Sequence, residues 1–535
     1  MSGNDEPLLI GGAGGSPDLT AEVAGSKAAQ LWRMVQLGLD VPPAFVMPTT
    51  LCSAVNARRT VALEKLQRGL AKGVAWLEEI SGRRFGDSRS PLLVSVRSGA
   101  AVSMPGMLET ILNIGLNDES VHGLIRVSGN PRLAFDSYRR LIQDYANVVD
   151  GVLASKFDQR LNDMIAREGV AGETELDPEA LERLAGEFRE LALRIAGRVL
   201  PDDPYEQLRG AAAAVYHSWE SARAREYRKL NRIDEMSGTA VTVQAMVFGN
   251  SGGRSGSGVA FSRNPATGAN ELYVDFLFDA QGEDVVSGRR TPANAKRLEA
   301  RLPQVARQLA EGVRRIEREF RYAQDVEFTV EDGRLYFLQS RAAKCTPRAA
   351  LRIAVDMVQE GVIDVATALA RLSDIDVAQL GIARFTEPAR TIANAIPASP
   401  GVASGRVAFD SRRAKELASA GEPVILVRPD TSTEDVGGFA IAAGILTAAG
   451  GRTAHAAVIA RQLGKVCLVG CHALAIDEQR REATMGDAFI HDGDWISLDG
   501  DTGDITLGKR SIVTGQPPGL AEVERWREQM THNPS

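Results

Sequence analysis

Two patterns of apolar residues alternate along the chain, one typical of helices and one typical of strands. From about residue 117 to 235, apolar residues recur at three- and four-residue spacing, which predicts a series of amphipathic helices. Short runs rich in β-branched residues stand on either side of this stretch and predict strands. The alternation of the two patterns indicates an α/β or α+β fold rather than an all-helical one.

Several elements can be placed from local signals. Helices are expected at 27–37 and, as a connector, over 349–380. Strands are expected over short apolar and β-branched runs at 44–47, 91–97, 239–248, 258–261, 271–276, 325–330 and 335–339. The last two strands are joined by Glu-Asp-Gly-Arg, which predicts a hairpin turn.

A segment dense in Pro and Gly at 396–401 marks a domain boundary. Beyond it, residues 397–508 alternate short strands with helices and predict a further compact domain. A short amphipathic helix and a polar tail are expected after Gly508.

Composition and charge narrow the class of protein. With 535 residues, 44% of them hydrophobic and 24% charged, the chain has the composition of a globular protein of about three domains. Its net charge of −7 argues against nucleic acid or an anionic membrane as the main partner. No apolar run reaches the roughly 18 residues of a membrane-spanning helix, and the acidic N-terminus lacks the layout of a signal peptide. The sequence therefore predicts a cytoplasmic protein.

Four cysteines are present, and their spacing indicates neither a disulfide framework nor a zinc site. Cys467 and Cys471 form the closest pair, but no second pair of soft ligands lies nearby. The thiol-poor sequence fits a reducing compartment.

The most informative segment runs from Thr447 to Gly464 and reads Thr-Ala-Ala-Gly-Gly-Arg-Thr-Ala-His-Ala-Ala-Val-Ile-Ala-Arg-Gln-Leu-Gly. A strand is expected to end at Thr447, a turn with two glycines follows, and Thr453 can cap a helix over about 454–463. His455 then lies in the first helical turn, where free backbone amides and the helix dipole favour a phosphoryl group. Imidazole is a competent nucleophile near neutral pH. A histidine that merely packs at a helix start is the alternative.

This segment resembles the phosphohistidine motif of the dikinase family, which includes pyruvate phosphate dikinase, phosphoenolpyruvate synthase and enzyme I of the sugar phosphotransferase system. The shared form is Gly-Gly-x-Thr-x-His-Ala-Ala, followed by an Ile/Val-Ala-Arg helix. The resemblance implies that His455 carries phosphate. Ala454 departs from the usual Ser or Cys before the histidine, so the local hydrogen bonding is expected to differ. Thr453 occupies a position that a regulatory protein phosphorylates in some members; otherwise it is a helix cap.

The resemblance extends over nearly the whole chain up to about residue 508 and implies an ATP site near the N-terminus. Gly-Ser-Lys27-Ala-Ala-Gln-Leu is similar to the family motif whose lysine touches the nucleotide phosphates, although a solvated lysine is the alternative for Lys27. Ser-Val-Arg97 leads into a loop of small residues that includes Gly106. The rigid guanidinium of Arg97 suits bidentate phosphate binding, and the loop amides can surround phosphate oxygens. A structural ion pair is the alternative for Arg97.

Two further motif matches add residues to the expected ATP site. The strand that contains Gln244 resembles the family's adenine-side strand. Ala-Gln-Gly-Glu283-Asp matches a signature of these enzymes and implies that Glu283 contacts the ribose or the phosphates. An ordinary surface glutamate is the alternative for Glu283.

The two strands of the predicted hairpin carry the residues expected to bind Mg²⁺ and the transferring phosphate. Asp325 and Glu327 stand two residues apart on one strand and therefore share a face. Glu327 and Gln339 of the next strand suit Mg²⁺, which prefers oxygen ligands together with phosphate oxygens. Arg341 would neutralise charge on the transferring group; a cross-strand ion pair with Glu327 is the alternative. By resemblance, these residues belong to an ATP-grasp domain.

The boundaries and the resemblance together divide the chain into four parts and predict an α/β (α+β) fold. An ATP-grasp nucleotide-binding domain is expected over 1–345, with a helical insertion at about 117–235. A helical linker over 346–392, a swivelling phosphohistidine domain over 393–508 and a C-terminal tail over 509–535 follow.

The resemblance implies an ATP-dependent phosphotransferase that uses ATP, Mg²⁺ and inorganic phosphate, releases AMP and pyrophosphate, and phosphorylates His455. The barrel that carries the phosphoenolpyruvate/pyruvate site in pyruvate phosphate dikinase needs about 250 residues. Too few residues follow Gly508, so that site is expected on a separate chain. Two alternatives remain open: transfer to a different small-molecule or protein acceptor, and a non-catalytic nucleotide-binding subunit. The sequence also leaves the oligomeric state open.

Overall fold

The computed structural model describes residues 6–12, 16, 19–102, 104, 109–230, 233, 238–286, 295–377, 380–430, 436–452, 455–477 and 480–532. Two compact units make up the chain. The first consists of Met1–Ser251 and Tyr336–Gln339, and the second of Gly252–Leu335 and Ser340–Ser535. This division falls inside the region expected to form the nucleotide-binding domain, and the four domain boundaries stay a prediction.

The first unit contains an antiparallel sheet with the strand order β1-β2-β7-β5-β6. Its strands are β1 (Leu8–Ile10), β2 (Ala44–Met47), β5 (Val94–Ala100), β6 (Thr110–Ile114) and β7 (Thr239–Ala245). Strand β7 lies between β2 and β5, so segments far apart in the sequence become neighbours. The three central strands are buried over most of their length, which accounts for their apolar and β-branched residues.

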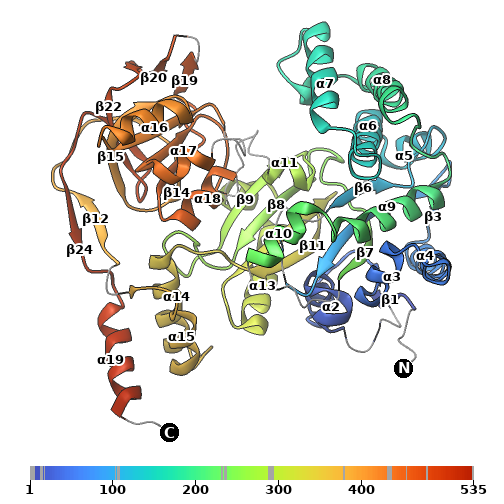
Figure 1. Cartoon of the computed structure of the whole chain (residues 1–535), viewed down its shortest axis with the longest axis horizontal. Coiled ribbons are helices and arrows are strands. Elements are labelled where there is room, and N and C mark those ends of the chain that lie inside the picture. Colours follow the sequence, from blue (N-terminus) through green and yellow to red (C-terminus); the bar gives the residue numbers. More distant parts are fainter. Residues whose placement is uncertain are drawn as a thin grey trace. The chain divides into compact units, whose positions relative to one another are not determined.

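Helices pack around this sheet, and a series of them follows β6 in the stretch whose apolar spacing predicted helices (Figure 1). Those before the insertion are α1 (Ala21–Ala24), α2 (Ser26–Gln36), α3 (Cys52–Asn56) and α4 (Thr60–Ser81). Those within it are α5 (Ser120–Ser128), α6 (Pro131–Val148), α7 (Ala154–Glu168), α8 (Pro178–Ala196), α9 (Pro204–Ser218) and α10 (Ala222–Leu230). Three of the helices begin with Pro after a capping side chain, which is Asn130, Asp177 or Asp203. The cap accepts a first-turn amide, and Pro fits the first position because that position needs no N–H donor.

The second sheet has the strand order β11-β10-β8-β9. Its strands are β8 (Gly256–Phe261), β9 (Tyr273–Phe278), β10 (Gln324–Glu331) and β11 (Arg334–Ala342). Helices that accompany it are α11 (Gly282–Val286), α12 (Ala295–Arg301), α13 (Pro303–Phe320), α14 (Pro347–Gln359), α15 (Val365–Arg371) and α19 (Leu520–His532). Apolar side chains of α14, α15 and α19 form one core with residues of β8 and β9, including Phe261, Met357 and Trp526. The C-terminal helix therefore packs as part of the second unit.

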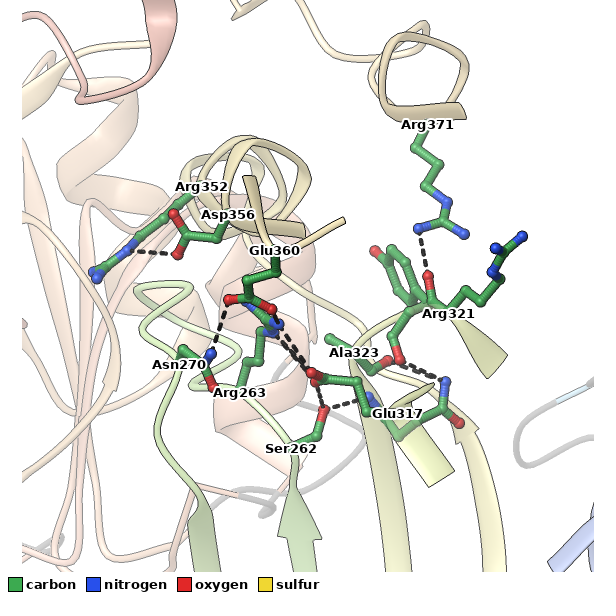
Figure 2. A network of polar contacts seen from close by, with 12 residues as sticks. Ser262, Arg263, Asn270, Glu317, Arg321, Ala323, Arg352, Asp356, Glu360 and Arg371 are labelled. Atoms are coloured by element: carbon green, nitrogen blue, oxygen red, sulfur yellow. Dashed lines mark hydrogen bonds and ion pairs between the residues drawn. The ribbon is translucent and has the colours of Figure 1, made fainter. Parts of the chain in front are cut away.

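A buried polar network joins the end of β8 to two helices (Figure 2). Arg263 is fully buried and contacts the carboxylates of Glu317 on α13 and of Glu360, which directly follows α14. Asn270 also donates to Glu360 at 2.9 Å. Ser262 completes the network through a hydrogen bond to Glu317. Because each charged group has an opposite charge beside it, the burial of Arg263 is compensated.

The predicted phosphohistidine domain contains a mixed sheet with the order β13-β23-β22-β15-β16-β17-β18-β14. Its strands are β13 (Thr391–Asn394), β14 (Ile396–Ser399), β15 (Val402–Ala408), β16 (Val424–Arg428), β17 (Gly444–Thr447), β18 (Val466–Val469), β22 (Trp495–Asp499) and β23 (Asp504–Leu507). Strands β15 to β18 are parallel. Their connections contain α16 (Ser411–Ser419), α17 (Val436–Ile441) and α18 (His455–Leu463), which pack against one side of the sheet.

Short strands complete the fold. They are β3 (Arg84–Phe85) with β4 (Pro91–Leu92), β12 (Ile382–Phe385) with β24 (Ile512–Gly515), and β19 (Leu474–Asp477), β20 (Glu482–Met485) and β21 (Ala488–His491).

Two predictions need correction. The connector predicted as one helical stretch over 349–380 is two helices, α14 and α15, because the intervening turn residues end the first helix. The region after Gly508 also forms a strand, β24, which the sequence analysis did not predict.

The α+β fold class predicted from the sequence is confirmed. Among the described residues, no helix combines the length and the apolar character that crossing a membrane requires.

Candidate functional site

The segment that carries His455 connects β17 to α18. Strand β17 ends at Thr447 and α18 begins at His455, so the histidine follows the carboxyl end of a parallel strand and opens a helix. In sheets of this kind ligands bind beyond the carboxyl ends of the strands, and the first helical turn favours anions. Because α18 begins at His455, the predicted position of this residue in the first helical turn is confirmed. Thr453 lies outside the described residues, and the structure describes the backbone of His455 but not its side chain.

Small residues fix how closely α18 approaches the sheet. Ala456, Ala457 and Ala460 are buried and pack in one core with Phe439 and Cys467. Their small side chains allow the helix to lie directly on β17 and β18. The alanines after His455 thus position the helix that begins with the histidine.

Arg461, which the sequence analysis did not assign to the site, holds the backbone around His455. Its Nη1 donates to the carbonyl oxygens of Arg452 at 2.8 Å and of Ala398 at 3.1 Å. The Arg461 side chain is almost fully buried, and burial lowers its pKa, opposed by nearby acidic groups. The Ile/Val-Ala-Arg part of the motif was a signal that could have singled out this residue.

The carboxylates predicted on β10 lie beside Arg341 of β11. Arg341 Nε donates to Asp325 Oδ2 at 2.8 Å, so the ion pair forms with Asp325. The pKa of Asp325 is raised, chiefly because the carboxyl group is buried. Arg341 acts in the opposite direction, and the negative charge of Glu327 adds to the rise. For Arg341, burial lowers the pKa while Asp325 and Glu327 raise it, with a net rise. Asp325 and Arg341 therefore form an ion pair, and Glu327 on the same strand as Asp325 acts on the pKa of both.

The two glutamines expected at the ATP site lie on different sheets. Gln339 lies on β11 and is largely buried. Gln244 lies on β7 and its Nε2 donates to the carbonyl oxygen of Pro42 at 3.1 Å. This hydrogen bond ties the Gln244 side chain to the segment before β2, and its predicted contact with the nucleotide stays a prediction.

The two N-terminal motifs lie side by side in the first unit. Lys27 is in the first turn of α2 and Arg97 is on β5. The Ser26 hydroxyl donates to the carbonyl of Ala100 at 3.0 Å. Gly25 has a φ of 80° and lies so near to β5 that an added Cβ would sit 2.0 Å from a carbonyl oxygen there. Glycine is therefore required at this approach.

Two predicted nucleotide contacts cannot be placed. Gly106 lies outside the described residues. Glu283 belongs to α11, but its side chain is outside the described part of the structure. Both roles stay predictions.

Comparison with known families covers both predicted functional parts of the chain. Residues 53–305 and 294–362 match the family "Pyruvate phosphate dikinase, AMP/ATP-binding domain". Residues 420–503, which include β17 and α18, match "PEP-utilising enzyme, mobile domain". The fold and site thus define a kinase-like protein that combines an ATP-grasp-type nucleotide-binding region with a mobile domain. The chain belongs to the pyruvate phosphate dikinase family.

Relatives in plants match almost the entire chain. The chloroplastic pyruvate, phosphate dikinase of Flaveria pringlei is 43% identical over 511 residues, which are 95% of this chain and 53% of the relative. Chloroplastic pyruvate, phosphate dikinase 1 of Zea mays is 43% identical over 504 residues, 94% of this chain and 53% of the relative. The enzyme of Flaveria trinervia is 44% identical over 501 residues, 93% of this chain and 52% of the relative. The chain therefore spans about half the length of these relatives.

Proposed function

We propose that this chain transfers phosphate from ATP to His455, as the first stage of a dikinase reaction. The observation that carries the proposal is the position of His455 at the start of α18, after the carboxyl end of β17, within the segment matched to a mobile domain. The preceding region matches an AMP/ATP-binding domain, and this match supports ATP as the phosphoryl donor.

The proposed chemistry has two steps. A ring nitrogen of His455 attacks the β-phosphorus of ATP, the bond from that phosphorus to the α,β-bridging oxygen breaks, and AMP leaves. An oxygen of inorganic phosphate then attacks the terminal phosphorus of the pyrophosphoryl group, the bond from that phosphorus to the β,γ-bridging oxygen breaks, and pyrophosphate leaves. One phosphoryl group remains on His455. Covalent catalysis of this kind separates a difficult transfer into two easier ones.

Three cationic side chains are proposed to hold the polyphosphate. Lys27 and Arg97 lie on adjoining elements of the first unit, and Arg341 lies on β11. An arginine can bind phosphate oxygens with two N–H groups at once, whereas lysine acts as a point charge. Arg341 is held by Asp325, which orients its guanidinium before substrate binds. We propose that it stabilises charge on the transferring group.

The carboxylates of β10 suit Mg²⁺. Asp325 Oδ1 is buried and, among the described residues, has no hydrogen-bond partner. The neighbouring Glu327 adds a second carboxylate, and both are oxygen donors of the kind that Mg²⁺ prefers. We propose that Glu327 and the side-chain oxygen of Gln339 would hold the ion, with the Asp325 carboxylate as a further oxygen donor beside Glu327. The ion would neutralise charge on the β- and γ-phosphates.

The final acceptor is proposed from the relatives, whose names specify pyruvate and phosphate. Pyruvate would accept the phosphoryl group from His455. Transfer to another small molecule or protein is the second candidate. A nucleotide-binding subunit without catalysis is the third.

A single-turnover reaction tests the proposal. The purified chain is mixed with Mg²⁺, phosphate and ATP labelled at the β-phosphorus, and AMP and acid-labile protein label are measured together. We expect AMP and label in equal amounts, and neither from His455→Ala, which should still bind ATP. Equal labelling of His455→Ala would refute the role of this histidine. Tight ATP binding without AMP or label would instead support the non-catalytic subunit.

A further inference from the structure

The loop before His455 is tied to its own domain by backbone-directed contacts. Arg461 bridges the carbonyl oxygens of Arg452 and Ala398, as described above. Arg452 Nε in turn donates to the carbonyl oxygen of Pro397 at 2.6 Å. Arg452 therefore has a fixed backbone and a fixed guanidinium orientation, three residues before His455.

The same guanidinium also contacts the nucleotide-binding sheet of the second unit. Its central carbon lies 4.2 Å from the ring centroid of Tyr273, the first residue of β9. This distance is well within the range of a cation–π interaction. Phe261 of β8 packs edge-on against Tyr273 at 6.1 Å between centroids and fixes the ring. Arg452 thus joins the loop before His455 to β9.

The charges and hydrogen bonds around this contact favour the face of the Tyr273 ring as the partner of the Arg452 guanidinium. Tyr273 is 6% exposed, and its hydroxyl has no hydrogen-bond partner within the described part of the chain. Burial lowers the pKa of Arg452 to about 10, while Glu271 raises it and Arg461 lowers it. The guanidinium therefore stays charged at neutral pH. A desolvated cation over an aromatic face is where this interaction is strongest.

We propose that Arg452 and Tyr273 form the contact that positions the His455 loop at the ATP-binding sheet for phosphoryl transfer. This inference rests on the proposed function, because it assigns a positioning role in the labelling of His455 by ATP. Arg452 acts through the loop and does not touch the reacting atoms. Loss of the contact reduces the fraction of molecules in which His455 can receive the phosphoryl group, and leaves the ATP site itself unchanged.

A double-mutant cycle measures this contact. Arg452→Met and Tyr273→Leu each remove one partner, and the single-turnover rate of His455 labelling is measured with ATP affinity for each variant. We expect each change to slow labelling by about 3- to 30-fold, the range that a cation–π interaction supports. ATP affinity should stay within about twofold of wild type. The double variant should be no slower than the slower single variant, because both changes remove the same interaction.

Conservative variants separate positioning from packing. Tyr273→Phe keeps the ring face and removes a hydroxyl without a hydrogen bond, so its labelling rate should match wild type; Arg452→Lys should keep part of the rate. Multiplicative effects in the double variant, a wild-type rate in Arg452→Met, or equal losses of labelling and ATP affinity would overturn the inference. If Tyr273→Leu does not fold, Arg452→Met and Tyr273→Phe still decide the question. A wild-type protein that never becomes labelled would overturn the proposed function first, and this inference with it.

Discussion

The buried Arg263 should contribute more to stability than any exposed ion pair near it. Its side chain is 0% exposed and donates to Glu317 at 2.9 to 3.2 Å and to Glu360 at 3.1 Å (Figure 2). Arg263→Met removes the cation and leaves two carboxylates facing each other, of which Glu317 is only 12% exposed. Removing one partner of a buried ion pair costs about 3–5 kcal/mol.

The exposure of the second carboxylate sets where in this range the loss should fall. Glu360 is 36% exposed, so water can solvate its charge once Arg263 is gone. We therefore expect a loss of about 3 kcal/mol, a large part of the 5–15 kcal/mol typical of a folded domain. Adding Glu317→Gln to Arg263→Met should recover part of it, because the buried charge then disappears.

A matched control lies in the same region. Arg352 pairs with Asp356 at 3.5 Å on α14, and its side chain is 48% exposed. Such a pair on a helix surface contributes about 0.3–0.5 kcal/mol, so Arg352→Met should change stability little. Calorimetric and urea unfolding of wild type and of the three variants would measure the difference. The reasoning is refuted if Arg263→Met and Arg352→Met have the same stability, or if Glu317→Gln makes Arg263→Met less stable.

Four further predictions concern other parts of the chain. Gly25→Ala should lower thermal stability and ATP affinity together, because φ is positive and the new Cβ would meet a carbonyl oxygen. Gly186→Ala, in an exposed stretch of α8 where an added Cβ meets nothing, should be neutral or stabilise by up to about 1 kcal/mol. For Asp136, burial raises the pKa but the arginines beside it lower it more, to below the ordinary value. The contribution of ionised Asp136 to the free energy of unfolding should therefore be complete above about pH 4 and be lost as the pH falls further. The difference in melting temperature between wild type and Asp136→Asn should accordingly shrink in acid. Arg341→Gln should slow His455 labelling at least tenfold, since a charged hydrogen-bond donor to phosphate contributes about 1.5–3 kcal/mol; a rate near wild type would remove Arg341 from the site.

Local sequence signals predicted much of the secondary structure. Strand β2 has the predicted bounds, and α2 is shifted by one residue at each end, because apolar spacing and Gly or Pro at the ends specify such elements locally. The start of α18 at His455 follows from the Gly-Gly turn and the helical pattern after it. These features depend on neighbours within a few residues, so the sequence alone was sufficient for them.

Contacts between distant residues were not predictable in the same way. The sequence suggested Glu327 as the alternative partner of Arg341, but the structure pairs Arg341 with Asp325, since side-chain direction and hairpin geometry decide which carboxylate is within reach. The spacing of motifs also gave no sign that Arg452 would lie against Tyr273, almost 180 positions away in the chain.

The sequence by itself determined the helical and strand periods, the phosphohistidine-like motif and the family resemblance, because each is written in adjacent residues. Only the tertiary structure decided which charges are buried and what they pair with. Arg263 reads as an ordinary loop residue in the sequence, yet it lies fully buried between Glu317 and Glu360, which are 54 and 97 positions away. Burial and pairing arise when separate elements pack together, and that packing determines the cost of each charge.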